Sequence, residues 1–580
     1  MPDETTSALK ALTHGKVQTS HLRQFPGMTG WFDPRLLLKL LWHVILADAF
    51  GQYADRRLME AALDPATEQE HFTRACDNTI APDEDGAVWI DYVSDLGDGF
   101  DATYAIACLL GEPSLDIDGQ QLPRGQILVM GGDQVYPTSL RDDYKIKMQL
   151  PYEFASPRIK GEDGRPLYVV PGNHDWYDGL VTFLALFCRA KPTRIGSWAT
   201  KQRRSYFAVK LTDNWWLWAI DIALVRDMDQ PQADYFVGIA KGMAENSNVI
   251  LCSAEPGWYS AEVDGDAYRT LSYAAGIAKN ADKSLRLPLT LSGDSHHYAR
   301  YVGANGHYIT SGGGAAFLHG TLELKDAIKA TWLEPETDLR LENCYPSKEE
   351  SSRLLLGNWR FPFLNPGLGL AISGLYLLAA FALASLWHWD VGLIIYAILF
   401  LGFWGYGAYQ ESSSAKVTLL AAAHALAHML VILGLAGIER WAEGVWGWAP
   451  WPFRLLVLTV PTFTIGWLLA GLIYGVSLLV SCRYFGISHN DAFSAMKLAS
   501  HRHFLRLRIK GDQVTVYPIK LDRTPKRSEW AIPEPRPARG PVFVPTPRLQ
   551  PELIEEPIVI KARGATSTED VKPAAELPEN

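Results

Sequence analysis

Four short polar clusters in the first half of the chain contain the residue types that hold divalent metal ions. They are Asp95-Leu-Gly-Asp98-Gly, Gly132-Asp133-Gln-Val-Tyr136, Gly172-Asn173-His174-Asp175 and Gly293-Asp294-Ser-His296-His297-Tyr298-Ala-Arg300. Carboxylates, an amide and imidazoles suit divalent ions, and two such ions about 4 Å apart can activate water for in-line attack on phosphorus. Each cluster alone is a weak signal, because Gly-Asp turns are common at strand ends. The prediction of a metal site therefore depends on the series.

Each cluster must be positioned by the element before it. Between Val88 and about Leu318, short apolar runs end in Gly- and Asp-rich turns, and longer helical patterns separate them. The runs cover residues 88–93, 126–130, 167–170, 215–220, 248–251 and 287–291. This pattern predicts an α/β or α+β sandwich with the polar clusters at the carboxyl ends of buried strands, where open sheets usually bind ligands.

The order of the clusters resembles the metallophosphoesterase (calcineurin-like phosphoesterase) superfamily over roughly residues 88–302. That family's pattern is Asp-x-His/Gly, Gly-Asp, Gly-Asn-His-Asp/Glu, a lone His and Gly-His-x-His. Gly-Asp-x-x-Tyr136 and the ending His296-x-Tyr298-x-Arg300 look most like the purple-acid-phosphatase-like branch. The resemblance implies a sandwich of two mixed β-sheets flanked by helices. It also implies that hydroxide activated by two divalent ions hydrolyses a phosphate ester. Mn²⁺ is the expected ion, with Mg²⁺, Fe or Zn²⁺ as alternatives.

Carried over residue by residue, the resemblance implies two metal sites. Asp95 and His296 would hold the first ion, with Tyr136 within reach of it. Asp133 would bridge both ions, and Asn173 would hold the second.

The same resemblance implies roles beyond metal binding. His174 would be the acid or charge stabiliser at the leaving oxygen, and Asp175 would orient its imidazole. Three further residues are candidates for substrate binding or for support of the site: Asp98, His297 and Arg300.

Two departures from the family pattern concern the second metal. The lone His is missing from the segment 251–256, and Asp294 stands where the first His of Gly-His-x-His is expected. Glu255 and Asp294 could supply carboxylates instead, and such an oxygen-rich site favours Mn²⁺ or Mg²⁺ over Zn²⁺. The alternative is that the second ion is lost. The protein would then be a catalytically weak or inactive membrane scaffold or sensor that keeps the phosphoesterase fold.

Residues 361–482 have a different composition. Long stretches without Asp, Glu, Lys or Arg each supply the roughly 20 apolar residues that cross a bilayer. We expect transmembrane helices near 364–387, 391–409, 417–437 and 455–480. The distribution of Lys and Arg places both soluble parts in the cytoplasm. The chain is therefore predicted to be a multi-pass protein of the cell's inner or plasma membrane, with the lipid bilayer as a partner.

The remaining segments complete the predicted organisation. They are an N-terminal helical region (1–87), the metallophosphoesterase domain (88–330), a linker (331–360), a cytoplasmic helix plus β-hairpin (483–522) and a Pro-rich, mostly disordered tail (523–580). The tail could bind a protein partner, and Leu553–Ile560 could add a strand to a sheet edge. The net charge of −10 argues against a nucleic-acid partner.

His424 and His428 lie one turn apart on the third predicted transmembrane helix. A metal or haem ligand pair is conceivable for two histidines at this spacing. Without a second His pair in the neighbouring spans, hydrogen bonding between helices is the favoured interpretation.

Overall fold

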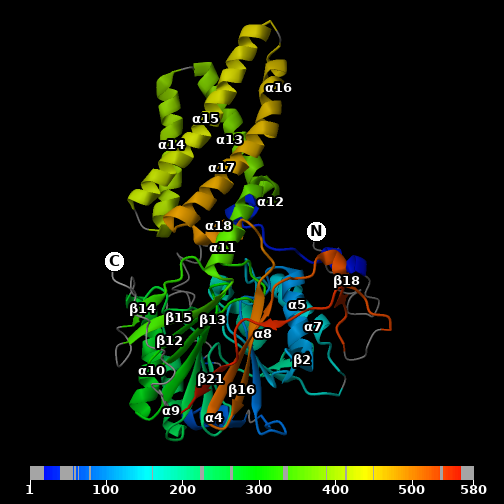
Figure 1. Cartoon of the computed structure of the whole chain (residues 1–580), viewed down its shortest axis with the longest axis vertical. Helices are drawn as coiled ribbons and strands as arrows, with labels where there is room; N and C mark the ends of the chain where they lie inside the picture. The colour runs from blue at the N-terminus through cyan, green and yellow to red at the C-terminus, as the bar shows by residue number, and fades with distance from the viewer. Residues whose placement is uncertain are drawn as a thin grey trace, which may run out of the picture.

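The chain forms a mixed α/β body with a bundle of long helices projecting from one end (Figure 1). The computed structural model describes residues 19–39, 57, 61–62, 64–77, 80–159, 161–222, 227–261, 265–330, 337–386, 388–411, 414–448, 450–535 and 540–562. In the predicted N-terminal helical region (1–87), residues 34–39 are helical, and residues 40–56 lie outside the described residues.

The first large sheet has the strand order β20-β17-β16-β1-β4-β5-β7-β6, with β21 beside β17, among the residues described. Its strands are β1 (Val88–Val93), β4 (Ile127–Met130), β5 (Arg165–Val169), β6 (Arg194–Ile195), β7 (Trp198–Thr200), β16 (Arg502–Lys510), β17 (Gln513–Leu521), β20 (Glu552–Leu553) and β21 (Ile558–Lys561). β1, β4, β5 and β7 run parallel, so the polar turns after β1, β4 and β5 emerge at one edge.

The second large sheet has the order β14-β15-β12-β13-β11-β10-β9-β8. Its strands are β8 (Phe207–Lys210), β9 (Trp215–Ile220), β10 (Asn248–Ser253), β11 (Arg286–Ser292), β12 (Tyr298–Gly303), β13 (Gly306–Ser311), β14 (Ala327–Ala330) and β15 (Thr337–Tyr345). Two small pairs, β2 (Ser114–Ile117) with β3 (Gln120–Pro123) and β18 (Trp530–Ala531) with β19 (Val544–Pro545), lie outside these sheets.

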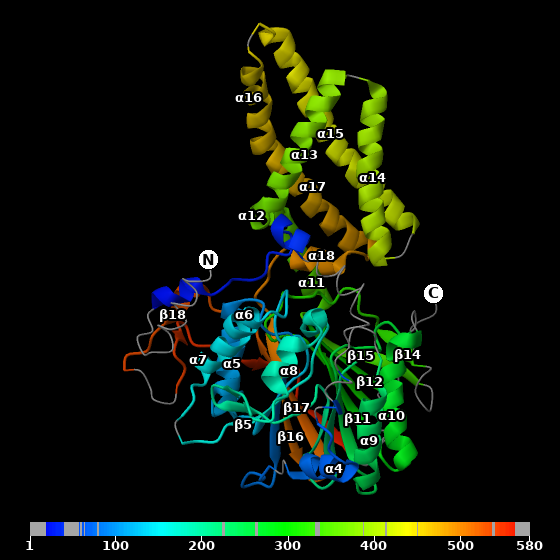
Figure 2. The ribbon, with the colours of Figure 1, turned by 180° about the vertical axis from the view of Figure 1, so that it is seen from behind.

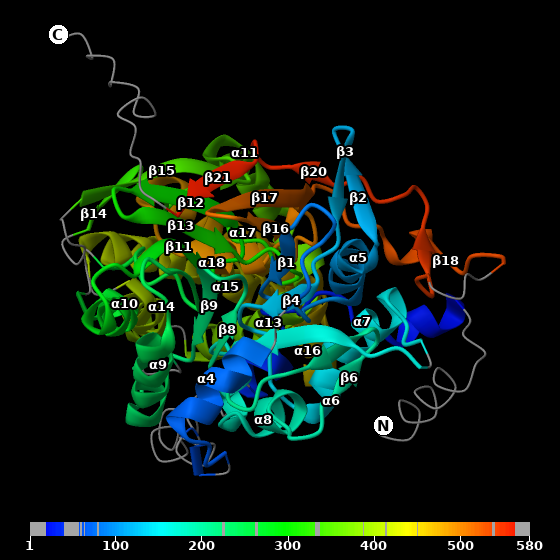
Figure 3. The same cartoon turned by 90° about the horizontal axis from the view of Figure 1, so that it is seen from below.

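The two sheets face each other across an apolar core. Because side chains alternate along a strand, Ile90 and Tyr92 of β1 join this core, where they are buried in one cluster with Leu217 of β9. Val93 points the other way and is buried with residues of α5 (Phe100–Gly111). Figure 3 shows α5 and α7 (Leu150–Ala155) outside one sheet, and α9 (Gln230–Gly242) and α10 (Arg269–Ala281) outside the other.

The predicted C-terminal hairpin exists, but it is not a separate segment. β16 pairs antiparallel with β1, with Val88 opposite Ile509 and Tyr92 opposite Leu505. The Nε of Arg506 lies 2.7 Å from Oδ1 of Asp91, and both side chains are fully buried. Thus the chain leaves the body, forms the long helices and returns to complete the first sheet.

Two further segments are more ordered than predicted. The expected linker 331–360 contains β15, which pairs with β12, and α11 (Lys348–Leu354). In the tail, β21 pairs with β17 through four residue pairs, which confirms the strand expected near 553–560. The tail is therefore built into the sheet up to Ala562, because its apolar residues cover an edge that β17 would otherwise expose.

Four helices among the described residues are long and apolar enough to cross a membrane. They are α13 (Pro366–Leu386), α14 (Trp389–Glu411), α15 (Ala415–Trp446) and a fourth made of α16 (Trp451–Pro461), η7 (Thr462–Gly466), α17 (Trp467–Val480) and η8 (Ser481–Phe485). These helices indicate a membrane protein. α15 is longer than the helix predicted near 417–437, because it continues to Trp446.

Short helices join the long ones to the body. These are α11, α12 (Phe361–Leu364) and α18 (His489–Ser494), which lie where the bundle meets the sheets (Figures 1 and 2). The side-chain amide of Asn358 donates to the carbonyl of Ala492 at 3.1 Å, and that of Asn365 donates to Ala495 at 2.9 Å. These buried hydrogen bonds fix the start of the first long helix against the segment that follows the last one.

Candidate functional site

Side chains from three strand ends meet at the hydroxyl of Tyr136. Asp95 follows β1, Asp133 follows β4, and His296 lies between β11 and β12. The Tyr136 oxygen is 2.8 Å from Oδ1 of Asp95, 2.9 Å from Oδ2 of Asp133 and 2.9 Å from Nε2 of His296. All four side chains are buried. Four residues that the sequence assigned to one metal centre are therefore brought together.

The cluster has too few protons for its acceptors. Nδ1 of His296 lies 2.7 Å from the carbonyl oxygen of Phe317, which can only accept, so Nδ1 carries the proton. When the ring is neutral, Nε2 presents a lone pair. The single hydroxyl proton of Tyr136 then faces two carboxylates and that lone pair. A cation at this position would balance the three acceptors.

The electrostatics of the cluster agree with this deficit of positive charge. Burial raises the pKa of Asp133 well above its ordinary value, and the nearby carboxylates of Asp95, Asp175 and Asp294 raise it further. Burial and the charges of Asp133 and Asp95 likewise raise the pKa of Tyr136.

The backbone around the cluster is shaped to admit it. A Cβ on Gly172 would lie 2.2 Å from Oδ1 of Asp133, and one on Gly293 would lie 2.6 Å from Oδ2 of Asp95. Asp95, Asp133 and Asp294 themselves adopt left-handed backbone conformations, with φ of 61°, 46° and 64°. Such conformations are uncommon outside glycine and concentrate at functional sites.

The residues expected at a second metal lie beside this cluster. Oδ1 of Asn173 is buried without a hydrogen-bond partner in the described part of the chain. The backbone N–H of Asp294 donates to Oδ2 of Asp95 at 3.0 Å, and the carboxylate of Asp294 raises the pKa of Asp133. Glu255 follows Ala254, whose carbonyl accepts from Gly293 N–H at 3.0 Å, so the backbone at Glu255 lies near the turn that carries Asp294.

These donors fit divalent metal ions in chemistry. The carboxylates, the imidazole Nε2, the phenol and the unpartnered amide oxygen of Asn173 are all metal-ligand types. However, no group of three or more His, Cys, Asp and Glu side chains in the described residues is arranged to hold a metal ion. In the cluster, Asp95, Asp133 and His296 meet through the hydroxyl of Tyr136 rather than around an open point.

The structure revises the predicted partnership of His174 and Asp175. Nδ1 of His174 lies 3.1 Å from the carbonyl oxygen of Pro137, so this carbonyl orients the imidazole. Asp175 instead accepts from the backbone N–H of Gly172 at 2.9 Å and from the hydroxyl of Tyr144. Burial lowers the pKa of His174 to about 4, whereas burial raises that of Asp175 to about 7. At neutral pH the His174 ring is therefore neutral, with a lone pair on Nε2.

Asp98 and Arg300, two of the three additional candidates, have structural partners. Oδ1 of Asp98 accepts from Thr29 N–H at 2.8 Å, and its Oδ2 accepts from Phe317 N–H at 3.1 Å. Arg300 pairs with Glu555 of the C-terminal segment at 2.6 Å. These contacts assign them to the assembly of the body, because they tie distant segments together.

His297, the third additional candidate, is also held by a neighbouring side chain. Its Nε2 lies 3.3 Å from the hydroxyl of Tyr259, and the two rings stack with centroids 6.0 Å apart. Burial lowers the pKa of His297 to about 3. The ring therefore stays neutral and packs against Tyr259.

Sequence reasoning missed His319. Its ring stacks on His296 at 4.0 Å between centroids, and its Nδ1 accepts from the backbone N–H of His296 at 3.2 Å. Its Nε2 lies 3.1 Å from Oδ1 of Asn490 in α18. The only sequence signal is the run Gly312-Gly-Gly314 shortly before it, since glycines permit close backbone approach.

Trp31 covers the other side of the site. Its ring lies edge-on to His174 at 5.9 Å and to Tyr136 at 6.3 Å. The next residue, Phe32, packs against Phe361 at 5.3 Å and Tyr474 of α17 at 5.7 Å. The site therefore lies at the end of the body from which the long helices project.

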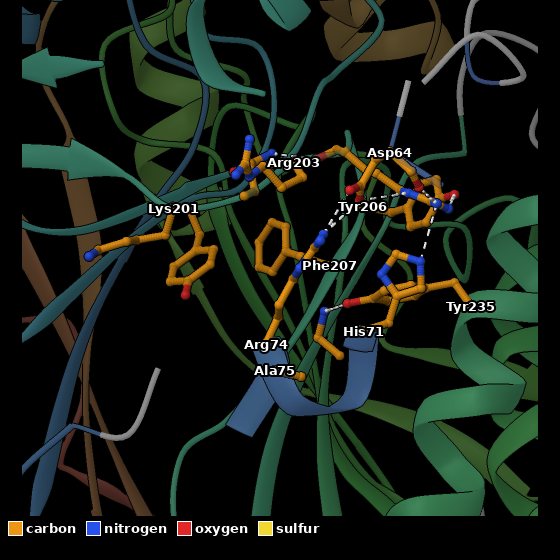
Figure 4. Close-up of a pocket in the computed structure, with 13 residues that line it drawn as sticks. Asp64, His71, Arg74, Ala75, Lys201, Arg203, Tyr206, Phe207 and Tyr235 are labelled. Atoms are coloured by element: carbon orange, nitrogen blue, oxygen red, sulfur yellow. Dashed lines mark hydrogen bonds and ion pairs between the residues drawn. The ribbon is translucent and has the colours of Figure 1, made fainter. Parts of the chain in front are cut away.

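A separate pocket lies between α4 (Glu68–Asp77) and β8 (Figure 4). Arg74 pairs with Asp64 at 2.7 Å, and Arg204 lies 3.6 Å from Asp64 and 3.2 Å from Nε2 of His71. Figure 4 shows Lys201 extending away from the other labelled side chains. Arg74 and Arg204 both pair with Asp64. These ion pairs attach the segment before α4 to the second sheet.

The two histidines of α15 bond to neighbouring helices, as the favoured interpretation predicted. Nδ1 of His424 lies 3.2 Å from Oγ of Ser477 in α17, and Nδ1 of His428 contacts the hydroxyl of Tyr376 in α13.

Comparison with known proteins gives little further information. The sequence matches no protein-family model and no curated protein. Among solved structures, one similar chain is GAP50, the anchor in the inner membrane complex of Plasmodium, at 15% sequence identity. The similarity covers 40% of this chain and 74% of that chain, with a TM-score of 0.29. At this level the two chains share too little to inform the function.

Proposed function

We propose that the protein is a metal-dependent phosphoesterase whose active centre is built by Asp95, Asp133, Tyr136 and His296. The observation that carries the proposal is their convergence, with one hydroxyl proton facing three acceptors at one point. Buried acceptors without a balancing charge are costly, and a divalent ion is the usual solution with these ligand types.

The residues of the centre would bind two metal ions. Asp95, His296 and Tyr136 would hold one ion, and Asp133 would reach both. Asn173 and Asp294, with Glu255 beside them, would hold the second. When bound, the ions would supply Lewis acidity and lower the pKa of water next to the phosphate ester. Mn²⁺ and Mg²⁺ suit this set better than Zn²⁺, because most of its donors are oxygens.

His174 would accept and donate a proton at its Nε2. Its Nδ1–H is committed to the Pro137 carbonyl, so only Nε2 can exchange a proton with substrate. A bound phosphate would bring negative charge next to the ring and raise its pKa from about 4. The protonated ring could then donate to the leaving oxygen.

We further propose that the four long helices span a membrane, with both soluble parts in the cytoplasm. Lys and Arg bias supports this orientation. Reporter fusions after Gly357 and after Asn580 should then read as cytoplasmic, and one after Gly447 should read as the opposite side. The active centre would lie close to the bilayer surface, so a membrane-associated phosphate ester is a reasonable substrate class.

The test is hydrolysis of an aryl phosphate by the full chain in detergent, with added Mn²⁺. Asp133→Asn should abolish turnover, because it weakens the carboxylate that both ions would share. Asp234→Asn, an exposed change of the same kind on α9, serves as the matched control.

The alternative function is a scaffold or sensor without catalysis. One observation favours it: among the described residues, no three His, Cys, Asp or Glu side chains are arranged to bind a metal ion. A folded full chain that takes up no metal and has no turnover would support it.

A further inference from the structure

A pocket opens at the end of the long helices that faces the body. It encloses about 70 Å³ between α14, α15, the fourth helix and the turn before α18. Its lining includes Phe403 and Tyr406 of α14, His424 of α15, Tyr474 of α17 and Asp491 of α18. If the helices span a bilayer, this end lies at the level of the lipid headgroups.

The lining of the pocket suits a cation. Asp491 contributes a carboxylate, and none of the described residues that line the pocket is Lys or Arg. The hydroxyl of Tyr406 donates to Oδ2 of Asp491 at 2.9 Å. Nε2 of His424 is buried without a hydrogen-bond partner among the described residues. Nδ1 of His424 lies 3.2 Å from Oγ of Ser477, and in the tautomer whose Nδ1–H donates to this hydroxyl, Nε2 offers a lone pair to a donor in the pocket.

The aromatic walls favour an organic cation over a metal ion. The ring of Phe403 stacks on His424 at 3.9 Å, and the ring of Tyr474 lies edge-on to it at 5.3 Å. Aromatic faces attract ammonium groups. A single carboxylate offers too few oxygens for Ca²⁺ or Mg²⁺. Lys416, at the same end of α15, donates to the Phe485 carbonyl at 3.3 Å and is exposed, so a lipid phosphate could meet it.

We propose that this pocket binds the primary ammonium of a phosphatidylethanolamine headgroup. Asp491 and Nε2 of His424 accept its N–H groups, and the rings of Phe403 and Tyr474 enclose it. The proposal depends on the membrane insertion proposed above, but not on the phosphoesterase activity. The pocket also lies close to the proposed active centre. Tyr474, which lines the pocket, contacts Phe32, and Asn490, next to Asp491, contacts His319.

The experiment is native mass spectrometry of the full chain released from nanodiscs. Two lipid mixtures are compared, dioleoyl phosphatidylglycerol with an equal amount of either dioleoyl phosphatidylethanolamine or dioleoyl phosphatidylcholine. The wild type should retain phosphatidylethanolamine. It should lose phosphatidylcholine, because the quaternary headgroup of that lipid has no N–H. Asp491→Asn should weaken retention about tenfold, since it removes the charged acceptor but keeps an oxygen for Tyr406.

Controls separate the outcomes. Asp390→Asn, at the far end of α14 and exposed, should retain the lipid as the wild type does. His424→Phe keeps a ring against Phe403 and should also weaken retention. Equal retention of the two lipids, or wild-type retention by Asp491→Asn, would overturn the proposal. Extraction of the protein by alkaline carbonate would contradict membrane insertion itself, and neither readout depends on phosphate hydrolysis.

Discussion

The hydroxyl of Tyr136 lies 2.9 Å from Nε2 of His296, although 160 residues separate them in the chain. The Phe317 carbonyl accepts from Nδ1–H of His296, so in the neutral ring this contact joins a phenol to the lone pair of Nε2. The same hydroxyl also lies within hydrogen-bond distance of Asp95 and Asp133, so three acceptors share its one proton.

Replacing Tyr136 by Phe should therefore destabilise the protein when metal is absent. Buried acceptors that lose their donor cost about 1–3 kcal/mol. We expect Tyr136→Phe to unfold at a lower temperature than the wild type in the presence of a chelator. Tyr273→Phe, at an exposed tyrosine of α10, should change nothing. Equal midpoints for Tyr136→Phe and the wild type would show that the hydroxyl does not hold the cluster.

A chain truncated after residue 350 should fail to fold, because it lacks β16 and β17. The missing hairpin leaves β1 as an exposed edge and removes the partner of buried Asp91. A chain in which a flexible linker replaces residues 366–485 retains both strands and should be soluble. Size-exclusion chromatography and circular dichroism distinguish the two. A monomeric, folded 1–350 fragment would contradict the placement of the hairpin.

The buried pair of Arg506 and Asp91 should matter more when one partner is removed than when both are. Arg506→Met leaves an unpaired carboxylate in the core and should cost about 3–5 kcal/mol of unfolding free energy. Asp91→Asn combined with Arg506→Met should recover part of that loss. Urea denaturation measures both, and a single variant as stable as the double would argue against the buried pair.

His503 should make stability fall in acid. Burial lowers the pKa of this ring to about 3 in the folded chain, against about 6.5 when unfolded. Below pH 6.5 the unfolded chain therefore takes up a proton that the folded chain does not. Stability should decrease by up to ~1.4 kcal/mol per pH unit from this ring. His503→Phe should make the thermal midpoint less dependent on pH, whereas His174 and His297, whose pKa values burial also lowers, keep part of that dependence. His388→Gln, at an exposed position, should leave it unchanged.

Local patterns predicted much of the fold. The apolar runs at 88–93 and 215–220 became β1 and β9 with the expected bounds, because buried strands have a compositional signature. The four apolar helices followed from the absence of charge. The pairing of β16 with β1 joins residues more than 400 positions apart, and nothing in either segment encodes its partner. That pairing was therefore missed.

The candidate site, like the fold, could be predicted only in part. That Asp95, Asp133, Tyr136 and His296 lie together could be predicted from their motifs, since each follows or adjoins a predicted strand. The partners of those motifs could not be assigned. The Pro137 carbonyl, rather than Asp175, orients His174, and His319 reaches the site from a loop without a motif. Such contacts depend on backbone geometry, such as the left-handed conformation of Asp133, that residue types alone do not specify.

The most direct test of the account is the metal content of the full chain, measured by elemental analysis together with aryl phosphate hydrolysis. The wild type, loaded with Mn²⁺ and freed of excess, should hold two ions per chain and turn over substrate. Asp294→Ala should hold one, and Asp133→Asn should lose both turnover and most of its metal. A wild-type protein that holds no stoichiometric metal, or an Asp133→Asn variant with unchanged metal and turnover, would contradict the proposed centre.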